Sequence, residues 1–371
     1  MPPADALDDA TAMDAANVDA STPEAPATDV FLDAPTGDPL SWDVRRAGPF
    51  NVGYRTFTTS YVAPGATVPR MLTIHVWYPT LATAGRHPRY ASLFTDPDAI
   101  VDAPLARTPY SSGRYPLQAF SHGHRGYAGN AAFMMRYFAS HGWIAAGPDH
   151  LGNTLDNSPE PRPINLYYLR ALDMTATLDG LARLPAADAL AGLVDTTRVL
   201  LTGHSFGTHT VWSAAGATFD VDAISARCVP AGSCTPADLA AFRAGTREAR
   251  FVAAIPMAGT IGREWFGPTG HTSVTLPMFA MSGTADPVGA DVQWMTTAPM
   301  PMTWIDIRGA CHQFFGFGGC MGIADALQPV IVGTYALALG RRTVLNDTNA
   351  AVAAILEGRQ VLSDTVTFLR R

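Results

Sequence analysis

Residues 199–207 read Val-Leu-Leu-Thr-Gly-His-Ser-Phe-Gly, an apolar run that passes directly into the motif Gly-x-Ser-x-Gly. The Val and Leu residues before the motif predict a strand, and residues 208–215 after it are typical of a helix. A sharp turn between strand and helix holds its central residue at strained backbone angles, and flanking glycines avoid collisions with the packed neighbours. The three fixed letters recur by chance in long sequences, but this setting favours a functional interpretation in which Ser205 is lifted into the open.

The chain downstream of this serine supplies the two partners that a serine nucleophile requires. A serine hydroxyl is a weak nucleophile at neutral pH, so it needs a histidine base that a carboxylate orients. In folds with this elbow the acid follows the serine and the histidine follows the acid. Residues 276–281 and 302–307 are predicted as strands, with Asp286 in the loop after the first and His312 in the loop after the second. The sequence therefore predicts a catalytic triad of Ser205, Asp286 and His312.

Three other carboxylates compete with Asp286 for the role of the acid, namely Asp306, Asp149 and Asp222. Asp306 falls within a predicted strand, six residues before His312, so we expect its side chain to point elsewhere. The sequence alone does not exclude Asp149 or Asp222 as the acid.

A second glycine-bearing loop predicts the oxyanion hole. Residues 115–120 are predicted as a strand, and Ser-His-Gly-His-Arg-Gly-Tyr follows at 121–127, ahead of a predicted helix. A loop in this place supplies one backbone N–H to the oxyanion, and the residue after the nucleophile supplies the other. His124 and Phe206 are therefore the predicted donors. His122 and His124 could instead hold a metal or act as a second base, but such a pair in a glycine loop is more often structural.

Composition predicts one large body behind an acidic tail. The chain has 371 residues, of which 47% are hydrophobic and 15% are charged, which suits a sizeable buried core. Residues 1–40 hold nine acidic and no basic residues, so a formal charge of −7 for the whole chain leaves about +2 for the remainder. We expect residues 1–42, rich in Ala, Asp, Pro and Thr, to be disordered, and residues 43–371 to form the catalytic domain. A near-neutral body gives no support to nucleic-acid binding.

The four cysteines fall into two local pairs, Cys228 with Cys234 and Cys311 with Cys320, and the second pair flanks His312. Local pairing favours disulfides and an oxidising compartment, although four reduced and buried cysteines remain the alternative. No Cys-x-x-Cys or compact Cys/His cluster is present, so we do not expect zinc. Nothing else in the sequence calls for a metal or an organic cofactor, and we expect neither. We expect an exported protein, whether secreted, periplasmic or lipid-anchored. No transmembrane segment and no export signal are visible in the sequence.

Strands and helices alternate along most of the chain. Residues 54–62 and 71–78 predict an antiparallel pair, residues 143–147 another strand, residues 164–184 a helix, and residues 251–256 a further strand. Such alternation predicts an α/β fold with a mostly parallel sheet flanked by helices, and ligands bind at the carboxyl ends of the strands of such a sheet.

Two later segments depart from simple alternation. Residues 217–248 predict a small insertion above the catalytic face, either a cap with Phe219 and Phe242 as apolar contacts or a surface excursion that a disulfide pins. Residues 326–339 predict an apolar helix, and residues 350–369 predict one or two helices that close the domain.

Several motifs together resemble one branch of the α/β-hydrolases. They are Gly-His-Ser-Phe-Gly at 203–207, Phe-Ser-His-Gly at 120–123, Ala-Ser-His-Gly-Trp at 139–143, Asp-His at 149–150 and Ile-Arg-Gly-Ala-Cys-His-Gln at 307–313. The resemblance is to the platelet-activating-factor acetylhydrolase and dienelactone-hydrolase-like branch, and it covers roughly residues 48–340. It implies an α/β-hydrolase fold and a serine-dependent carboxylic ester hydrolase. The implied substrates are short-to-medium acyl esters or phospholipid-like acetyl esters.

A second resemblance is to bacterial cutinase-like polyester hydrolases, through residues 139–142, residues 194–199 and the loop around Asp286. The acetylhydrolases carry their acid after the strand at 251–256, where this chain has Met-Ala-Gly, so the resemblance to cutinases also assigns the acid to Asp286. Dienelactone hydrolases use cysteine at the elbow, where this chain has Ser205.

The alternatives that the sequence leaves open are of two classes. Within serine hydrolases they are a polyester hydrolase, a peptidase or a thioesterase. From a different class, the chain could be a catalytically silent binding protein on the same fold. The expected partner is an ester substrate, whether small molecule, lipid or polyester, and we expect a monomer.

Overall fold

The structure, a computed structural model, describes residues 35–228, 233–289 and 291–371. Most of the predicted acidic tail, residues 1–34, lies outside the described residues. The rest of it contacts the body, because Arg341 Nη1 donates to the carbonyl of Trp42 at 2.8 Å and Asn349 Nδ2 donates to that of Leu40 at 3.3 Å. The packed body therefore begins before residue 43.

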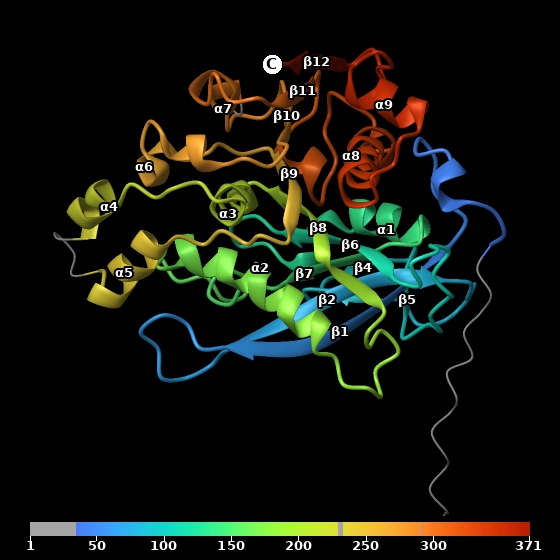
Figure 1. Cartoon of the computed structure of the whole chain (residues 1–371), viewed down its shortest axis with the longest axis horizontal. Coiled ribbons are helices and arrows are strands. Elements are labelled where there is room, and N and C mark those ends of the chain that lie inside the picture. The colour runs from blue at the N-terminus through green and yellow to red at the C-terminus, as the bar shows by residue number, and fades with distance from the viewer. Residues whose placement is uncertain (1–34, 229–232, 290) are drawn as a thin grey trace, which may run out of the picture. The chain divides into compact units, whose positions relative to one another are not determined.

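A large mixed sheet forms the centre of the fold (Figure 1). Among the described residues, ten strands join it in the order β12-β11-β10-β9-β8-β6-β7-β2-β1-β5. The strands from β11 to β7 run parallel to their neighbours, whereas β2 pairs antiparallel with both β7 and β1, and β12 pairs antiparallel with β11. The predicted α/β fold with a mostly parallel sheet is confirmed. The strands are β1 Asn51–Tyr61, β2 Arg70–Thr80, β5 Ile100–Val101, β6 Tyr115–Ser121, β7 Ile144–Pro148, β8 Val194–His204, β9 Phe251–Met257, β10 Phe279–Gly283, β11 Thr303–Ile307 and β12 Val366–Arg370.

Helices cover both faces of this sheet. Helices α2 and α3 pack on one face, and α1 and α8 pack on the other. The alternation of side chains along a strand divides the core accordingly: in β8, Val199 and Leu201 join the α2/α3 side, while Leu200 joins the α1/α8 side. The helices are α1 Ala132–Ser140, α2 Leu166–Ala182, α3 Phe206–Ala215, α4 Val221–Cys228, α5 Pro236–Ala244, α6 Arg263–Phe266, α7 Asp291–Thr296, α8 Thr334–Val344 and α9 Ala350–Leu356.

The C-terminal segment differs from the prediction. Helix α9 ends at Leu356, and the chain then forms the edge strand β12, so the prediction of helix through residue 369 is wrong. Residues 366–370 read Val-Thr-Phe-Leu-Arg, a short stretch with β-branched and aromatic residues. Its pairing with β11 supplies backbone hydrogen bonds that only the tertiary fold can offer, and the backbone of Arg371 continues the pairing to Met302 at 3.1 Å.

The predicted insertion at 217–248 consists mainly of α4 and α5, which the Cys228–Cys234 pair links. Phe219 and Phe242 are 5% and 1% exposed, and their rings lie 5.0 Å apart, packed among other core aromatic side chains. The two side chains that the cap interpretation offers as apolar contacts are therefore core residues.

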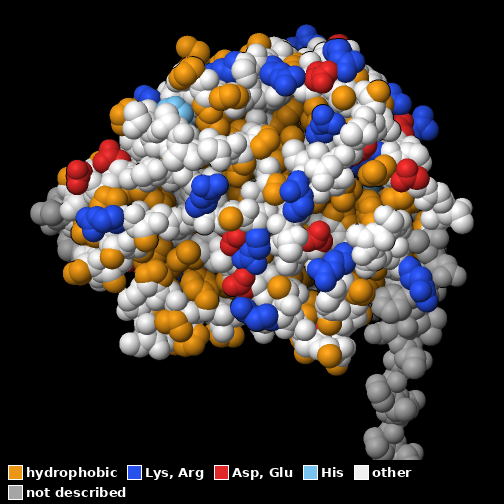
Figure 2. All heavy atoms as spheres, in the orientation of Figure 1, with side chains coloured by type: hydrophobic (Ala, Val, Ile, Leu, Met, Phe, Trp, Pro, Cys, Tyr) orange, Lys and Arg blue, Asp and Glu red, His pale blue; other side chains and the backbone are white. Residues whose placement is uncertain are grey.

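Two surface properties bear on partners. On the face drawn in Figure 2, basic, acidic and hydrophobic side chains are interspersed, so this face has no continuous basic surface for nucleic acid. Within the described part of the chain, none of the helices has the length and apolar character that a membrane crossing requires.

Candidate active site

Ser205 occupies a strained turn between β8 and α3. Its backbone has φ 57° and ψ −120°, values that a non-glycine residue adopts at a cost of about 1 to 3 kcal/mol. Both neighbouring glycines are required by close packing, since a Cβ at Gly203 would overlap the carbonyl of Gly207, and a Cβ at Gly207 would overlap the carbonyl of Ser121. The predicted strand, sharp turn and helix are confirmed, and the turn presents Ser205 at the carboxyl end of a central strand.

Asp286 and His312 form a hydrogen-bonded pair in the loops after β10 and β11. His312 Nδ1 lies 3.0 Å from Asp286 Oδ2, and the backbone N–H of Val288 donates to Asp286 Oδ1, also at 3.0 Å. The Asp286 side chain is 1% exposed and that of His312 is 24% exposed. Burial alone would raise the pKa of Asp286, but the hydrogen bonds from His312 and Val288 outweigh it, so the pKa lies below its usual value. An ionised carboxylate only accepts, so Nδ1 carries the imidazole proton and Nε2 is left free to act as a base.

The His312 loop is docked against the elbow. His204, the residue before the serine, donates from Nε2 to the backbone carbonyl of His312 at 3.0 Å, and the two rings lie 4.7 Å apart. Burial, together with the neighbouring imidazole, lowers the pKa of His204 to about 3, so this donor stays neutral. Among the described residues no hydrogen bond joins Ser205 Oγ to His312. Serine–histidine hydrogen bonds are often long without a substrate and shorten when one is bound.

The competing acids have other partners. Asp306 accepts from Ser282 Oγ at 2.8 Å, and Asp149 accepts from the backbone N–H of Ala128 at 2.7 Å. Asp222 lies exposed in the first turn of α4. Of the four candidate acids, Asp286 is the one that contacts His312.

The predicted oxyanion loop lies directly beside the serine. A Cβ added to Gly123 would lie 3.0 Å from Ser205 Cβ, a tighter contact than most Cβ atoms make, so glycine favours this approach. Phe206 is the first residue of α3, where the backbone N–H has no acceptor within its own helix. The His124 imidazole lies 3.0 Å from Glu160 Oε1 through Nε2, and His124 lines the same pocket as Ser205.

The ring of His122 has a structural role in this loop. Its Nδ1 donates to the carbonyl of Gly123 at 2.7 Å, and its Nε2 accepts from the backbone N–H of His150 at 3.0 Å. Both ring nitrogens are therefore engaged by backbone groups, one in the loop and one at His150. The part of the chain that the structure describes contains no group of three or more His, Cys, Asp or Glu side chains suited to hold a metal ion.

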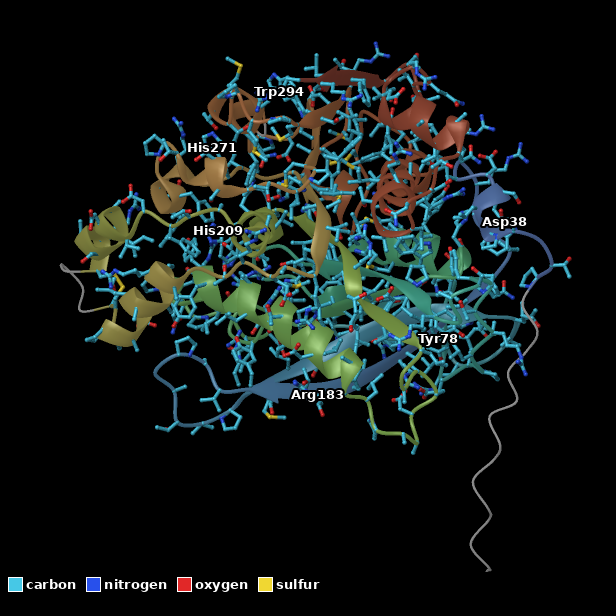
Figure 3. The ribbon with its side chains drawn as sticks, viewed as in Figure 1. Asp38, Tyr78, Arg183, His209, His271 and Trp294 are labelled. Atoms are coloured by element: carbon cyan, nitrogen blue, oxygen red, sulfur yellow. A yellow bond between two sulfur atoms is a disulfide. The ribbon has the colours of Figure 1, made fainter. Side chains whose placement is uncertain are left out.

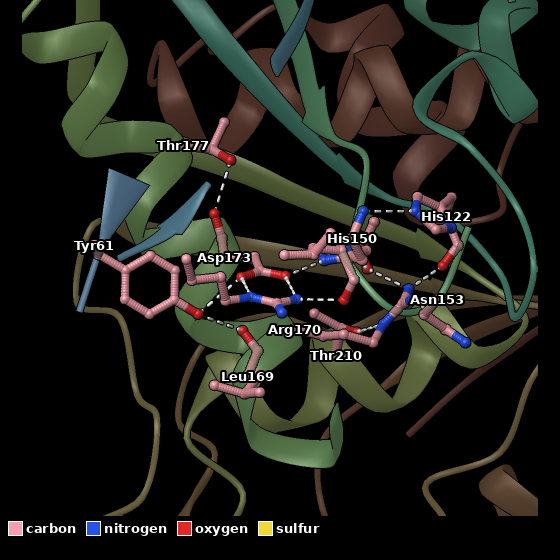
Figure 4. A network of polar contacts seen from close by, with 12 residues as sticks. Tyr61, His122, His150, Asn153, Leu169, Arg170, Asp173, Thr177 and Thr210 are labelled. Atoms are coloured by element: carbon pink, nitrogen blue, oxygen red, sulfur yellow. Dashed lines mark hydrogen bonds and ion pairs between the residues drawn. The ribbon is translucent and has the colours of Figure 1, made fainter. Parts of the chain in front are cut away.

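A buried polar network contacts the loop that begins at Ser121 (Figure 4). Asp173, on α2 and fully buried, accepts from Arg70 Nε at 2.7 Å, from Tyr61 OH at 2.8 Å and from His150 Nδ1 at 2.9 Å. His150 Nε2 lies in turn 2.9 Å from the hydroxyl of Ser121, at the start of the loop. The carboxylate of Asp173 thus fixes the position of the loop through the imidazole of His150.

Arg170, one turn before Asp173 on α2, is also fully buried. It donates to Asn153 Oδ1 at 2.7 Å, to Ser121 Oγ at 3.1 Å and to the backbone carbonyl of His122. Its guanidinium carbon lies 4.7 Å from the centre of the Phe206 ring. One buried cation therefore contacts both segments that carry the predicted oxyanion donors. Sequence analysis missed this network, for which the only local signal was a pair of charged residues inside a mostly apolar helix.

A pocket of about 240 Å³ adjoins Ser205. Tyr167 and Trp265 stack at 3.5 Å between ring centres and form one wall together with Phe206. His209, on α3 and labelled in Figure 3, lines the same pocket, as does Arg162. The pocket therefore combines three aromatic rings with polar side chains, including Ser205 and Arg162.

Both predicted cysteine pairs lie at disulfide geometry, with Cα–Cα distances of 5.3 Å for Cys228–Cys234 and 5.7 Å for Cys311–Cys320. Disulfides persist in oxidising compartments, so the two pairs fit an exported protein. The second pair closes the loop that begins with His312, which restrains the position of the imidazole.

Comparison with known proteins returned no matching family model and no significant match among curated protein sequences. The functional argument therefore depends on the geometry of the site.

Proposed function

We propose that this chain is a serine-dependent carboxylic ester hydrolase of the α/β-hydrolase type. The observation that carries the proposal is the buried carboxylate of Asp286 on Nδ1 of His312, in a loop held against the residue that precedes a strained elbow serine. The order serine, acid, histidine along the chain supports it, as does a serine at the carboxyl end of a strand in a mostly parallel sheet.

The reaction begins with attack of Ser205 Oγ on the ester carbonyl carbon. Nε2 of His312 takes the hydroxyl proton as the new C–O bond forms, and the carbonyl oxygen becomes a tetrahedral oxyanion. Collapse of this intermediate breaks the bond to the alcohol, which leaves with the proton from Nε2. A water molecule then attacks the acyl-enzyme, His312 accepts its proton and returns it to Ser205 Oγ, and the carboxylic acid is released.

Two features of the site lower the barrier for these steps. Asp286 holds the proton of His312 on Nδ1 and stabilises the imidazolium that forms. The backbone N–H groups of His124 and Phe206 are the proposed donors to the oxyanion, and each such donor is worth about 3 to 4 kcal/mol in serine hydrolases.

The pocket beside Ser205 favours esters with short-to-medium acyl chains, because about 240 Å³ accommodates a small group and three aromatic side chains line it. One observation also favours a cutinase-like polyester hydrolase as second candidate. The acid that contacts His312 is Asp286, after β10, whereas the chain after β9 carries no carboxylate at residues 257–259. A polyester film assay separates the two candidates.

The test is hydrolysis of 4-nitrophenyl esters from acetate to octanoate, with matched 4-nitroanilides and thioesters as comparators. We expect the esters to be the preferred substrates, with the best turnover at short chains, and Ser205→Ala to abolish turnover. Preference for anilides or thioesters would reassign the protein to the peptidases or thioesterases. Failure to hydrolyse any of the three classes would favour a catalytically silent binding protein.

A further inference from the structure

Arg162 holds a positive charge against the wall of the Ser205 pocket. Its guanidinium carbon lies 4.1 Å from the centre of the Phe206 ring, and Nη1 donates to Tyr167 OH at 3.2 Å. Phe206 and Tyr167 line the pocket together with Ser205 and Arg162 itself. The cation is thus positioned by two side chains of the pocket and lines the same pocket as Ser205.

Arg162 has no acidic partner among the described residues, in contrast to Arg70 and Arg341. Arg70 bonds Asp173 at 2.7 Å and Arg341 bonds Asp347 at 2.7 Å, whereas no Asp or Glu oxygen of the described residues lies within 4.0 Å of Arg162. Its Nε is buried and has no hydrogen-bond acceptor within the described ranges. A guanidinium presents its donors as a planar fork that matches a carboxylate or a phosphate.

The charges around the pocket reinforce this preference. Arg170 approaches the same Phe206 ring at 4.7 Å, so two guanidinium groups contact one aromatic side chain. His209, which lines the pocket, is neutral, because burial and the charges of these two arginines outweigh its hydrogen bond to Tyr167 and lower its pKa to about 3. Glu264 is the acidic side chain of the pocket, and it is solvent-exposed.

We propose that Arg162 binds an anionic group, a carboxylate or a phosphate, that the ester substrate carries close to its scissile bond. This inference rests on the proposed esterase function and names the class of its substrates. The anion lies in the pocket against the guanidinium fork while the ester carbonyl reaches Ser205. Arg162 is then the residue that sets specificity.

The experiment compares two pairs of esters that differ in charge. On the acyl side, 4-nitrophenyl hydrogen succinate is compared with 4-nitrophenyl butyrate; on the alcohol side, 3-acetoxybenzoate is compared with phenyl acetate. In at least one pair we expect the anionic member to have the higher kcat/KM by about tenfold or more, as expected for a charge-assisted hydrogen bond. Arg162→Gln reduces this ratio of kcat/KM values by about the same factor.

Inhibition by free anions separates the two ligand chemistries. Succinate and inorganic phosphate are tested as competitive inhibitors of butyrate ester hydrolysis by the wild-type enzyme. The stronger inhibitor identifies the preferred anion, and Arg162→Gln weakens its inhibition. The matched control is Arg227→Gln, because Arg227 is an exposed arginine that lies 5.8 Å from the Trp265 ring without lining the pocket. We expect Arg227→Gln to leave the preference for the anionic ester unchanged.

Equal kcat/KM values for the charged and neutral members of both pairs would overturn the inference and leave the esterase proposal intact. The inference is also overturned if the folded Arg162→Gln enzyme keeps the wild-type preference for the anionic ester. It is overturned as well if Arg162→Lys and Arg162→Gln lower kcat/KM equally for the charged and the neutral esters. No hydrolysis of any ester would instead overturn the proposed function, and the specificity inference with it.

Discussion

Replacing Asp286 by Asn tests the acid–histidine pair with little change in shape. The backbone N–H of Val288 donates to Asp286 Oδ1 at 3.0 Å, so the carbonyl oxygen of the new amide turns toward that N–H. The amide NH₂ then occupies the position of Oδ2, 3.0 Å from His312 Nδ1. Because an NH₂ group donates, Nδ1 must accept, and the imidazole proton moves to Nε2, where it prevents the ring from taking the proton of Ser205.

The expected cost is a fall in kcat of about 10⁴-fold with KM little changed, the size found when a triad aspartate becomes asparagine. At about 1.4 kcal/mol per tenfold, this corresponds to about 5 to 6 kcal/mol of lost transition-state stabilisation. The assay is steady-state hydrolysis of 4-nitrophenyl butyrate at neutral pH, with thermal unfolding to verify that the variant is folded.

The matched control is Asp306→Asn. Asp306 is on β11, was a competing candidate in the sequence, and bonds Ser282 at 2.8 Å instead of His312. We expect this variant to keep kcat within a few-fold of wild type. Activity of Asp286→Asn within a few-fold of wild type would refute the assignment, as would equal losses in the two variants.

Three further predictions concern the network, the loop disulfide and buried histidines. Arg170→Met removes the cation that joins the two oxyanion segments, so kcat for the butyrate ester falls at least about tenfold. The control is Arg341→Met, at a buried arginine remote from the site, which lowers the unfolding free energy by about 3 to 5 kcal/mol without lowering kcat of the folded enzyme. Similar kcat values for the two variants would contradict the role of Arg170. Replacing Cys311 and Cys320 by Ser lowers the unfolding free energy, measured by urea unfolding, by up to about 3 kcal/mol and also lowers kcat. The same change at Cys228 and Cys234 lowers stability alone. Equal effects of the two changes on kcat would contradict the claim that the Cys311–Cys320 disulfide positions His312. Burial lowers the pKa values of four histidines to about 3 or 4, so the unfolded chain binds protons between pH 6.5 and pH 4 that the folded chain does not, and stability is lost as the pH falls through this window. At pH 5 each of these histidines lowers the unfolding free energy by about 2 kcal/mol relative to pH 7. An unfolding temperature that does not change from pH 7 to pH 5 would contradict this prediction. These histidines are His141, His150, His204 and His209.

The elbow could be predicted from sequence because its signal is local. The strand-forming run, the motif Gly-x-Ser-x-Gly and the helix-forming run are contiguous, and Gly203 and Gly207 approach each other within the same turn. The pairing of Asp286 with His312 could be predicted as well, since loops at the carboxyl ends of adjacent parallel strands meet. The sequence favours Asp286 but leaves Asp149 and Asp222 as competitors, because excluding them requires the distances between loops.

The supporting network could not be predicted, because its members come from separate elements. Asp173 is on α2, Arg70 on β2 and Ser121 on β6, and none of them is close to another in sequence. In the sequence each of them is an ordinary polar residue. Burial in the fold makes an unpaired charge or polar group costly, so these side chains are stable in the core only when they bond one another. The same reason explains β12, whose short segment becomes a strand through pairing with β11.

The central claim is that His312 activates Ser205, and a phosphorylating inhibitor tests it most directly. The protein is treated with diethyl 4-nitrophenyl phosphate, the release of 4-nitrophenol is followed, and the modified peptide is identified by mass spectrometry. We predict one equivalent of 4-nitrophenol per chain, a diethylphosphoryl group on Ser205, and a rate reduced by about 10³-fold or more in His312→Ala. Modification of another residue, or an unchanged rate in the folded His312→Ala variant, would contradict the account.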